Sequence, residues 1–572
     1  MMDILEKPPA GHVLDDTQPL SCIIEAAQTV QGHTDYVIKV QRGPIPENCW
    51  RVTRRYSDFA SLNATLQTYS IDLSLPSKKV FGNLDREFVA ERQQGLQSYL
   101  DALAGHLMVS SNILVKKFLD PESYAINYQE SALQHVSMFF RSEPKWEMSE
   151  VQQDIGWRIK KQYFMVKHVD RPKHRQLLTW ASLGPDNFLS TKDLDSIMRL
   201  LPSLKHPFIL PITFAMANEN GGLAIRTYIS EGTLRDRVYK TRPRQPYLKK
   251  YGKPKSVTPL PQNEIKTFGR QILEALKFLH DKGLPYGHLH AGNVIIDNGS
   301  CKLLDVENHL LGLPGFYRSY ITLLKRASST EAIDVYCFGH VLYEMAVGTP
   351  LASATCDSLP SCCSPQVRSV LEMVLTSEAL RTGLPDVATL IAQPLFSDVP
   401  VSYLEKPQMK VSSRLREAIQ KSKEAMETRL KEEKKAITQH KRISKAQAKH
   451  MSEEEKKKRK KKALSAARIA QNSSSEQVNG GVSGDSSSSR STTPQMAGTL
   501  SPTPQVLTPP LPPPPPGTLP APISQPSQPS AIPVSSPTLP SSDRGALLGS
   551  IQGFSKSALK KAETEDKSAP RM

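Results

Sequence analysis

Polar and apolar residues alternate in three short segments near the N-terminus. The segments are SCIIEAAQTV (21–30), DYVIKVQRG (35–43) and CWRVTRRYSDF (49–59). This pattern predicts β-strands, because branched and aromatic side chains suit a half-buried pleated surface. Helical spacing follows at about 57–70 and 85–119. We therefore expect a mixed α+β domain over residues 17–125, preceded by a loose arm up to about residue 16.

A second mixed pattern occupies residues 145–400. It begins with strand-like pieces and continues into long amphipathic helices, the clearest being NEIKTFGRQILEALKFLHDKG (263–283). Apolar residues recur there every three to four positions, which indicates one buried face. This region is the second predicted folded domain.

The composition changes after residue 410. Residues 410–470 are rich in Lys, Arg, Glu and Ala, with sparse apolar residues at helical spacing, and are predicted to form a basic charged helix. Residues 471–542 are rich in Ser and Pro and are predicted to be a disordered linker. Apolar patterning returns at 543–562.

The net charge of the chain is +17, which favours acidic partners such as membrane lipid or nucleic acid. Residues 414–468 hold twenty Lys and Arg against eight Asp and Glu, so most of the excess lies there. The start of the chain has no apolar signal segment, and no run approaches the ~18 apolar residues that span a bilayer. The seven cysteines lack metal-ligand spacing, which favours free thiols. Any membrane contact is therefore expected to be peripheral.

The motif RRYSDFASL (54–62) carries the chemistry of the first domain. An arginine fork suits phosphate oxygens, and a neighbouring tyrosine ring can stack on a sugar-like surface. LSLPSKKVFGNLDREFVAER (73–92) adds lysines after a proline turn and an arginine on a helix. Together these features resemble the PX domain, a family that binds phosphoinositides.

The PX resemblance implies four lipid contacts. Arg55 would hold the 3-phosphate, Tyr56 would stack on the inositol ring, Lys78 would bind the 1-phosphate and Arg92 the ring hydroxyls. The implied ligand is phosphatidylinositol 3-phosphate or a related lipid. Three neighbouring side chains have a purely structural or surface interpretation: Arg54, Phe59 and Lys79.

Residues 286–307, YGHLHAGNVIIDNGSCKLLDVE, resemble a protein kinase catalytic loop and the metal-binding segment after it. DVYCFGHVLYEMAVGTP (334–350) resembles the later kinase helix, with Asp334 in the position that anchors the loop. FMVK (164–167) resembles the strand that carries the ATP-contacting lysine. The resemblance implies a two-lobed α+β kinase-like domain over 145–400.

The resemblance also implies a nucleotide site with Lys167 on ATP and with Asn293 and Asp305 on the metal. ATP and Mg²⁺ would then bind without turnover, and the same three residues have an alternative, structural interpretation. No cofactor is required for the predicted function.

Several parts of the catalytic machinery are replaced. His288 stands where kinases have the catalytic aspartate, His290 replaces the loop lysine, and Glu307 replaces the D-F-G glycine. No G-x-G-x-x-G precedes the strand, and the nearest acid to the expected glutamate position at Ile197 is Asp195. A neutral imidazole can accept a proton but does not supply the charge of a carboxylate. We therefore predict a pseudokinase with no catalytic residue; the alternative is an active atypical serine/threonine kinase on endosomal membranes.

RGALLGSIQGFSKSALKKA (544–562) places apolar residues on one helical face, followed at a distance by Leu-Lys-Lys. It resembles the WASP-homology-2 motif, which lays a helix in a groove of actin. The resemblance implies six actin contacts, and the proline run upstream (509–516) is a companion that recruits profilin. The six residues are Leu547, Leu548, Ile551, Leu559, Lys560 and Lys561. The alternative is an ordinary amphipathic turn.

The cluster KKKRKKK (456–462) is open to several interpretations: a nuclear import signal, a nucleic-acid patch, a contact with anionic lipid or a solvated charge run. The neighbouring lipid domain favours lipid. Nucleic acid is disfavoured, because no aromatic residues interleave with the lysines.

The order of the parts resembles the family of PX domain-containing kinase-like proteins over essentially the whole chain. That resemblance implies a peripheral membrane scaffold that engages Na,K-ATPase β subunits and modulates the pump. The implied location is cytoplasmic, on endosomal or plasma membrane, with a nuclear pool as a further interpretation of the lysine cluster.

Overall fold

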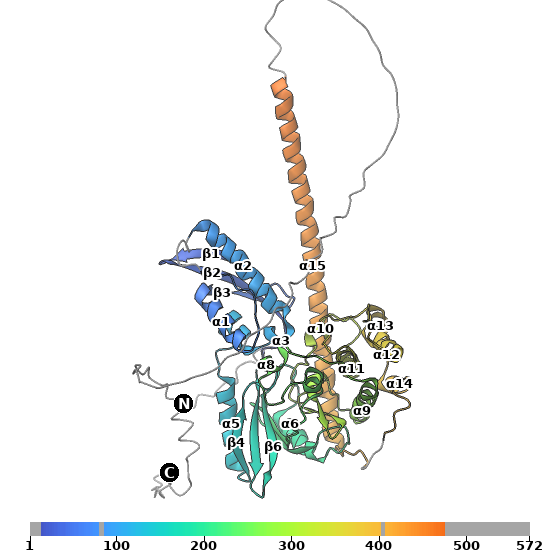
Figure 1. The fold of residues 1–572 in the computed structure, drawn as a ribbon. Helices are drawn as coiled ribbons and strands as arrows, with labels where there is room; N and C mark the ends of the chain where they lie inside the picture. The colour runs from blue at the N-terminus through green and yellow to red at the C-terminus, as the bar shows by residue number, and fades with distance from the viewer. Residues whose placement is uncertain (1–12, 79–84, 402–405, 475–572) are drawn as a thin grey trace, which may run out of the picture. The chain divides into compact units, whose positions relative to one another are not determined.

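The computed structural model describes residues 13–78, 85–401 and 406–474, and many side chains beyond residue 447 are not described. All described residues belong to one unit, Met1–Gln477. The N-terminal part is an antiparallel sheet covered by helices (Figure 1). Its strands, in sheet order, are β1 (Leu20–Val30), β2 (His33–Arg42) and β3 (Cys49–Arg55). The helices are α1 (Tyr56–Thr68), α2 (Arg86–Gly105), α3 (Leu107–Ser110) and α4 (Ile113–Leu119).

The core of this domain forms around Phe59. Its ring is fully buried and meets Tyr36, Tyr99 and Phe118 edge to face, with ring centroids 4.9–6.4 Å apart. Edge-to-face pairs are a preferred arrangement of buried aromatic rings. The three predicted strands are confirmed, whereas the helical pattern over 85–119 divides into three helices.

Helix α5 (Tyr128–Ser142) precedes a five-stranded antiparallel sheet in the order β4-β5-β6-β8-β7. Its strands are β4 (Trp146–Gln152), β5 (Lys161–His168), β6 (Arg171–Ser182), β7 (Ile212–Ala217) and β8 (Gly221–Thr227). Helix α6 (Thr191–Leu200) and the short turn η1 (Leu201–Ser203) lie between β6 and β7 in the chain. This sheet with its helix is the smaller lobe of the second domain.

The larger lobe is mainly helical. It holds the turn η2 (Ala291–Asn293) and the small hairpin β9 (Val294–Asp297) and β10 (Ser300–Leu303). Its helices are α7 (Leu234–Tyr239), α8 (Tyr247–Tyr251), α9 (Gln262–Asp281), α10 (Arg318–Ile321), α11 (Thr330–Val347), α12 (Pro365–Leu375), α13 (Ser377–Thr382) and α14 (Val387–Ile391). The two lobes confirm the predicted kinase-like α+β fold. In the described ranges, no helix combines the length and apolarity that crossing a bilayer requires.

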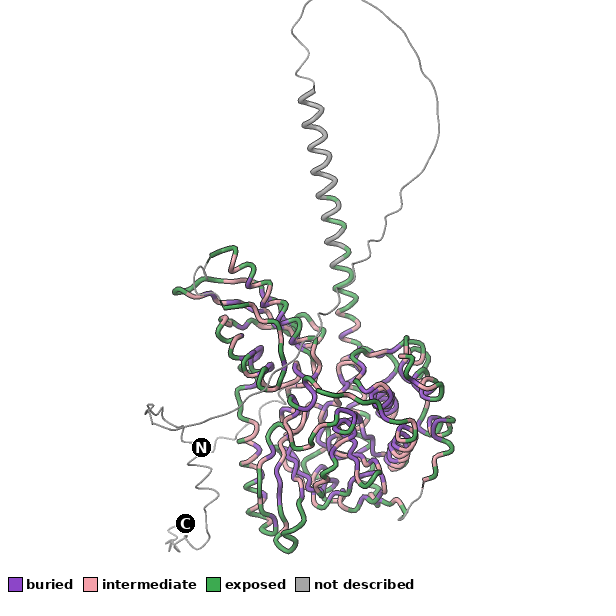
Figure 2. The backbone as a smooth tube through the Cα atoms, viewed as in Figure 1, coloured by how far each residue is buried: buried purple, intermediate pink, exposed green. Residues whose placement is uncertain are grey.

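The long helix α15 (Ser413–Ser474) forms in the region where the sequence predicts a separate charged helix. Its first half instead packs on the kinase-like domain, and Figure 2 shows buried and partly buried residues along that half. The packed stripe consists of Ile419, Met426, Leu430 and Ile437, all buried. Their spacing of seven, four and seven residues keeps them on one helical face.

Ion pairs reinforce the packing of α15. The buried Arg318 lies 3.3 Å from Asp186 and 2.7 Å from Glu433, and Arg429 of α15 also contacts Asp186. The Lys434 ammonium donates to the Ala327 carbonyl, and burial lowers the pKa of this lysine to about 8. The helix thereby holds the segment between β10 and α11.

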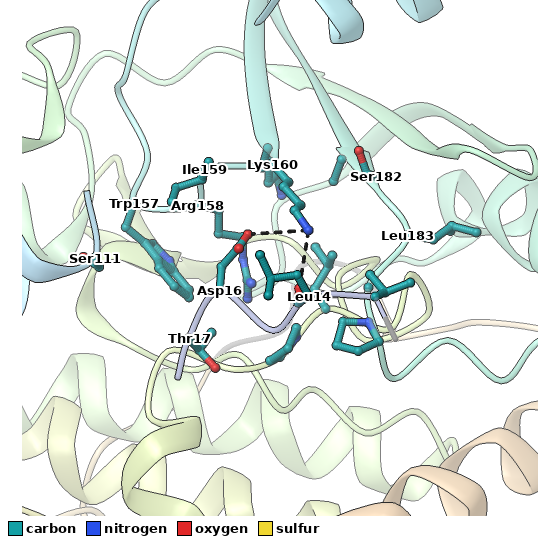
Figure 3. A pocket seen from close by; sticks show the side chains of 17 residues that line it. Leu14, Asp16, Thr17, Ser111, Trp157, Arg158, Ile159, Lys160, Ser182 and Leu183 are labelled. Atoms are coloured by element: carbon teal, nitrogen blue, oxygen red, sulfur yellow. Dashed lines mark hydrogen bonds and ion pairs between the residues drawn. The ribbon is translucent and has the colours of Figure 1, made fainter. Parts of the chain in front are cut away.

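The segment 13–17 is not the loose arm that the sequence predicts. Figure 3 shows it against the loop that precedes β5, where Lys160 Nζ donates to the Leu14 carbonyl at 3.4 Å and lies 4.0 Å from Asp16. The Tyr124 hydroxyl also donates to Asp16, at 3.0 Å. Burial raises the pKa of Asp16 although Lys160 opposes the shift. These contacts join the N-terminal segment to both domains.

Candidate functional site

The first candidate site lies where α1 begins. The Tyr56 hydroxyl donates to the Pro76 carbonyl at 2.6 Å, which fixes the tyrosine beside the proline turn. The guanidinium of Arg92 lies 4.5 Å from the centre of the Tyr56 ring, and its Nη2 donates to Ser77 O at 3.4 Å. The structure therefore brings together the predicted tyrosine, the helix arginine and the turn that leads to the lysine.

Arg55 and Lys78 remain accessible at this site. Arg55 is the last residue of β3, its side chain is 56% exposed, and its Nε lies 3.3 Å from Asp35 Oδ1. Lys78 is exposed and is the last described residue before the gap at 79–84. Two cations open to solvent thus stand in the same region as a tyrosine–arginine pair, an arrangement that suits a phosphorylated sugar.

Two neighbouring residues have the structural role that the sequence predicts. Arg54 donates from Nε to the Phe118 carbonyl at 2.9 Å, so its guanidinium ties β3 to α4. Phe59 is a core aromatic. Lys79 lies outside the described residues.

The second candidate site is the cleft of the kinase-like domain, and its loop is anchored as predicted. Asp334, fully buried on α11, accepts hydrogen bonds from the backbone N–H of Tyr286 (3.2 Å) and Gly287 (2.6 Å). It also lies 2.8 Å from Nε2 of His280 at the end of α9. The loop is therefore held in place even though its chemistry has changed.

His288 occupies the position of the catalytic aspartate and is buried. Its Nδ1 lies 3.1 Å from Nη2 of Arg158, from the loop before β5. Burial, together with the Arg158 cation, lowers the pKa of His288 well below its usual range. The imidazole is therefore neutral at physiological pH and faces a permanent cation, so it is a poor base.

Asp305, the predicted metal ligand, forms ion pairs with cationic side chains of the protein itself. Lys161 Nζ lies 2.9 Å from Asp305 Oδ2 and 3.5 Å from Glu307 Oε1. Arg226, at the end of β8, contacts Glu307 and lies 3.7 Å from Asp305. Burial opposes the charge of Asp305, but Lys161 and Arg226 outweigh it and lower the pKa. Two carboxylates and two cations thus form a closed, buried network.

The prediction that Lys167 contacts the nucleotide is wrong. FMVK lies on β5, the second strand of the sheet, and the exposed Lys167 is near the turn into β6. The lysine that reaches Asp305 is Lys161, at the opposite end of the same strand. One signal in the sequence could have pointed to Lys161: it begins a strand-like segment, five residues after Gly156.

The loop before β5 contacts the altered catalytic loop. Trp157 Nε1 donates to Nε2 of His290 at 3.2 Å, next to the contact between Arg158 and His288. Sequence reasoning missed both residues of this loop. The remaining cavity, about 900 Å³ with its open mouth, has an apolar floor that includes Leu177 and Ile295.

Neither a regulatory glutamate nor a metal centre is assembled at the cleft. Asp195 of α6 accepts from the backbone of Ala217 and pairs with Arg199, so it does not reach the cleft lysine. Asn293 donates from Nδ2 to the His288 carbonyl at 3.1 Å. In the part of the chain that the structure describes, no cluster of three or more His, Cys, Asp or Glu could hold a metal. Asp305, one of the two candidate metal ligands, already has Lys161 and Arg226 as counter-ions, and the ATP and Mg²⁺ prediction stays a prediction.

In the segment that replaces D-F-G, residues 305–307, the backbone of Asp305 is left-handed (φ +57°), whereas Glu307 has no positive φ. The side chain of Glu307 is instead used in the ion network. Replacing the D-F-G glycine therefore adds a buried charge without requiring Glu307 to adopt a left-handed backbone conformation.

These features define a class: a PX-like lipid domain followed by a kinase-like domain with an altered catalytic loop. The comparisons agree with it. The PX domain model matches residues 44–122, and the WH2 motif model matches 540–569, which lie outside the described residues. The six predicted actin contacts fall inside the second match.

The mouse PX domain-containing protein kinase-like protein is 54% identical over 448 residues, covering 78% of this chain and 77% of the relative. The chain belongs to this family. The Drosophila Slowpoke-binding protein is 34% identical over 276 residues, 44% of this chain and 52% of that protein. A Dictyostelium relative, "probable inactive serine/threonine-protein kinase slob1", is 35% identical over 239 residues, 37% of this chain and 41% of that protein.

Proposed function

We propose that the chain is a peripheral membrane scaffold whose kinase-like domain transfers no phosphate. In this proposal, the PX domain binds phosphatidylinositol 3-phosphate or a related lipid, and the WH2 motif binds actin. The proposal keeps the predicted parts, at 17–125, 145–400, 410–470, 471–542 and 543–562, as predictions. The observation that carries the proposal is the closed network of Lys161, Arg226, Asp305 and Glu307 beside a neutral His288.

This network opposes each step of phosphoryl transfer. Kinases need a free aspartate for Mg²⁺, a carboxylate near the accepting hydroxyl and an open site for the phosphates. Here Lys161 neutralises Asp305, an imidazole replaces the carboxylate, and Arg158 lies against that imidazole. The apolar floor of the cavity could still accept the base of ATP, so the proposal allows nucleotide binding without turnover and requires no cofactor.

The partners proposed beyond lipid and actin rest on resemblance. The Drosophila relative's name says that it binds Slowpoke, which supports a scaffold that binds another protein here. Na,K-ATPase β subunits remain the proposed cargo from the family resemblance, and profilin the proposed ligand of the proline run. The proposed location is the cytoplasmic face of endosomal or plasma membrane.

Purified full-length protein is expected to show only background phosphate incorporation with Mg²⁺-ATP or Mn²⁺-ATP. His288→Asp should not restore transfer, because Lys161 still occupies Asp305. The measurement is phosphate incorporation into the protein and into a generic substrate. Incorporation above background that disappears in Asp305→Ala would establish the atypical kinase instead.

The lipid site is tested by Arg55→Ala in the full-length protein. Loss of one charged phosphate contact should weaken binding to vesicles with phosphatidylinositol 3-phosphate by roughly tenfold to a hundredfold. Arg51→Ala is the matched control, because Arg51 lies on the same strand and pairs with Glu25 at 2.7 Å. Equal binding by both variants would remove Arg55 from the site.

A further inference from the structure

A basic insert, residues 240–255, lies between α7 and α9 and contains α8. Its sequence, KTRPRQPYLKKYGKPK, has seven Lys and Arg and no Asp or Glu. None of the motifs described above includes this insert, and the functions proposed above do not involve it. Such a concentration of one charge on a folded surface indicates an interaction with anions.

The apolar residues of the basic insert hold it against the PX domain. Leu248 is 2% exposed and belongs to the hydrophobic core of the PX domain, and α8 lies beside α3 (Figure 1). His106 Nε2 lies 2.8 Å from the Gly252 carbonyl, and the Tyr247 hydroxyl lies 2.8 Å from Met108 Sδ. The insert is therefore packed against the PX domain through Leu248 and against the kinase-like domain through Tyr247 and Tyr251.

Its cations face solvent and mostly lack counter-ions. Arg244 pairs with Glu150 at 2.6 Å, and the buried Lys250 pairs with Asp236 at 3.0 Å. The other five are exposed, and no acidic side chain pairs with them among the described residues. These five are Lys240, Arg242, Lys249, Lys253 and Lys255.

The surroundings of these cations narrow the class of partner. Single-stranded nucleic acid binds where aromatic rings are free to stack on bases. Both tyrosines of α8, Tyr247 and Tyr251, are buried and cannot do so. Protein interfaces centre on apolar or aromatic anchors, yet the basic insert contributes no exposed large hydrophobic residue. A surface with charge but no anchor suits the headgroups of an anionic bilayer.

We propose that the basic insert is a second membrane contact that binds anionic phospholipid headgroups without headgroup specificity. The inference rests on the membrane attachment proposed for the PX domain, since that domain brings the insert to the bilayer. The lipid pocket supplies recognition of the phosphoinositide, and the insert adds strength that depends on the general anionic lipid of the membrane.

The test compares full-length wild type with the triple variant Lys249→Ala, Lys253→Ala, Lys255→Ala. Vesicles carry phosphatidylinositol 3-phosphate either in phosphatidylcholine alone or together with phosphatidylserine. Each surface cation contributes roughly fivefold to binding an anionic membrane, so three should contribute at least roughly tenfold. We expect this loss on the phosphatidylserine vesicles, and a change within about twofold on the others. The loss should shrink as salt rises.

A matched control removes three other exposed cations, Arg171, Lys173 and Arg175, from the β5–β6 hairpin. Both variants keep the basic cluster of α15 and lose three exposed cations, so they differ only in where the lost charge lay. Equal losses in the two variants would show a general charge effect and overturn the proposal, as would phosphatidylserine binding that the insert variant leaves unchanged. Thermal unfolding checks that each variant is folded.

Arg55→Ala, run in parallel, separates this inference from the proposed lipid pocket. If this variant binds both vesicle types more weakly but keeps the same gain from phosphatidylserine as the wild type, the two contacts act independently, as proposed. If Arg55→Ala binds normally, the lipid pocket fails, and the insert is still judged on phosphatidylserine alone.

Discussion

Glu307→Ala is expected to lower the melting temperature of the kinase-like domain by roughly 6–20 °C. Glu307 is 2% exposed and contacts both Lys161 and Arg226. Removing one member of a buried ion network leaves uncompensated charge and costs about 3–5 kcal/mol. A domain of this size loses ~2–4 °C for each kcal/mol. The measurement is thermal unfolding of the full-length protein.

The control for this prediction is Glu378→Ala. Glu378 pairs with Arg381 at 2.7 Å on the surface of α13, where both side chains are more than half exposed. Exposed pairs contribute about 0–1 kcal/mol, so this variant should melt within about 4 °C of wild type. If the two variants melt together, the buried network does not stabilise the kinase-like domain.

The double variant Leu547→Ala with Leu548→Ala is expected to weaken binding of the 543–562 segment to monomeric actin by roughly thirtyfold or more. A buried leucine contributes about 2–3 kcal/mol of transfer free energy, and the motif places both leucines on one apolar face. Titration of a labelled peptide with actin measures the effect. The residues lie within the WH2 match, at 540–569.

Lys560→Ala serves as the comparison within the same motif. Its contribution is mainly electrostatic, so it should be smaller and should fade between low and moderate salt. A wild-type peptide that shows no saturable binding at micromolar actin would end the actin proposal. A lysine effect that exceeds the leucine effect would mean that the helix does not enter a groove.

Local motifs allowed several features to be predicted from the sequence. The loop around His288 and its anchor Asp334 are separated by 46 positions, yet each sits in a distinctive stretch, and the hydrogen bonds from Tyr286 and Gly287 join them as expected. Tyr56 and Arg92 likewise come together where the PX motifs predict. A motif is informative when its residue types are tied to one backbone geometry.

The cleft lysine could not be predicted, because its identity depends on the order of strands in the sheet. FMVK has the composition of the strand that carries the nucleotide lysine in kinases, but it forms the strand before that one. The sequence therefore predicted Lys167 in place of Lys161. The partners of Lys161 lie more than 140 positions away in the chain, at Asp305 and Glu307. No local pattern encodes such a pairing.

The docking of α15 was missed for a related reason. Among the described side chains of α15, the four buried apolar residues are separated by many charged ones. Some of these charges have distant partners: Arg429 contacts Asp186, 243 positions earlier. The local composition is that of a solvated helix. Only the folded structure shows which charged residues of α15 form ion pairs within the protein.

The stripe on α15 has a practical consequence for dissecting the chain. A fragment cut near residue 400, where the composition changes, would keep the kinase-like lobes but lose the side chains that cover them. The surface beneath Ile419, Met426 and Leu430 would face water, and Arg318 would lose Glu433. Uncovered apolar surface promotes self-association. Recombinant fragments intended for crystallisation or binding assays should therefore extend past Ile437.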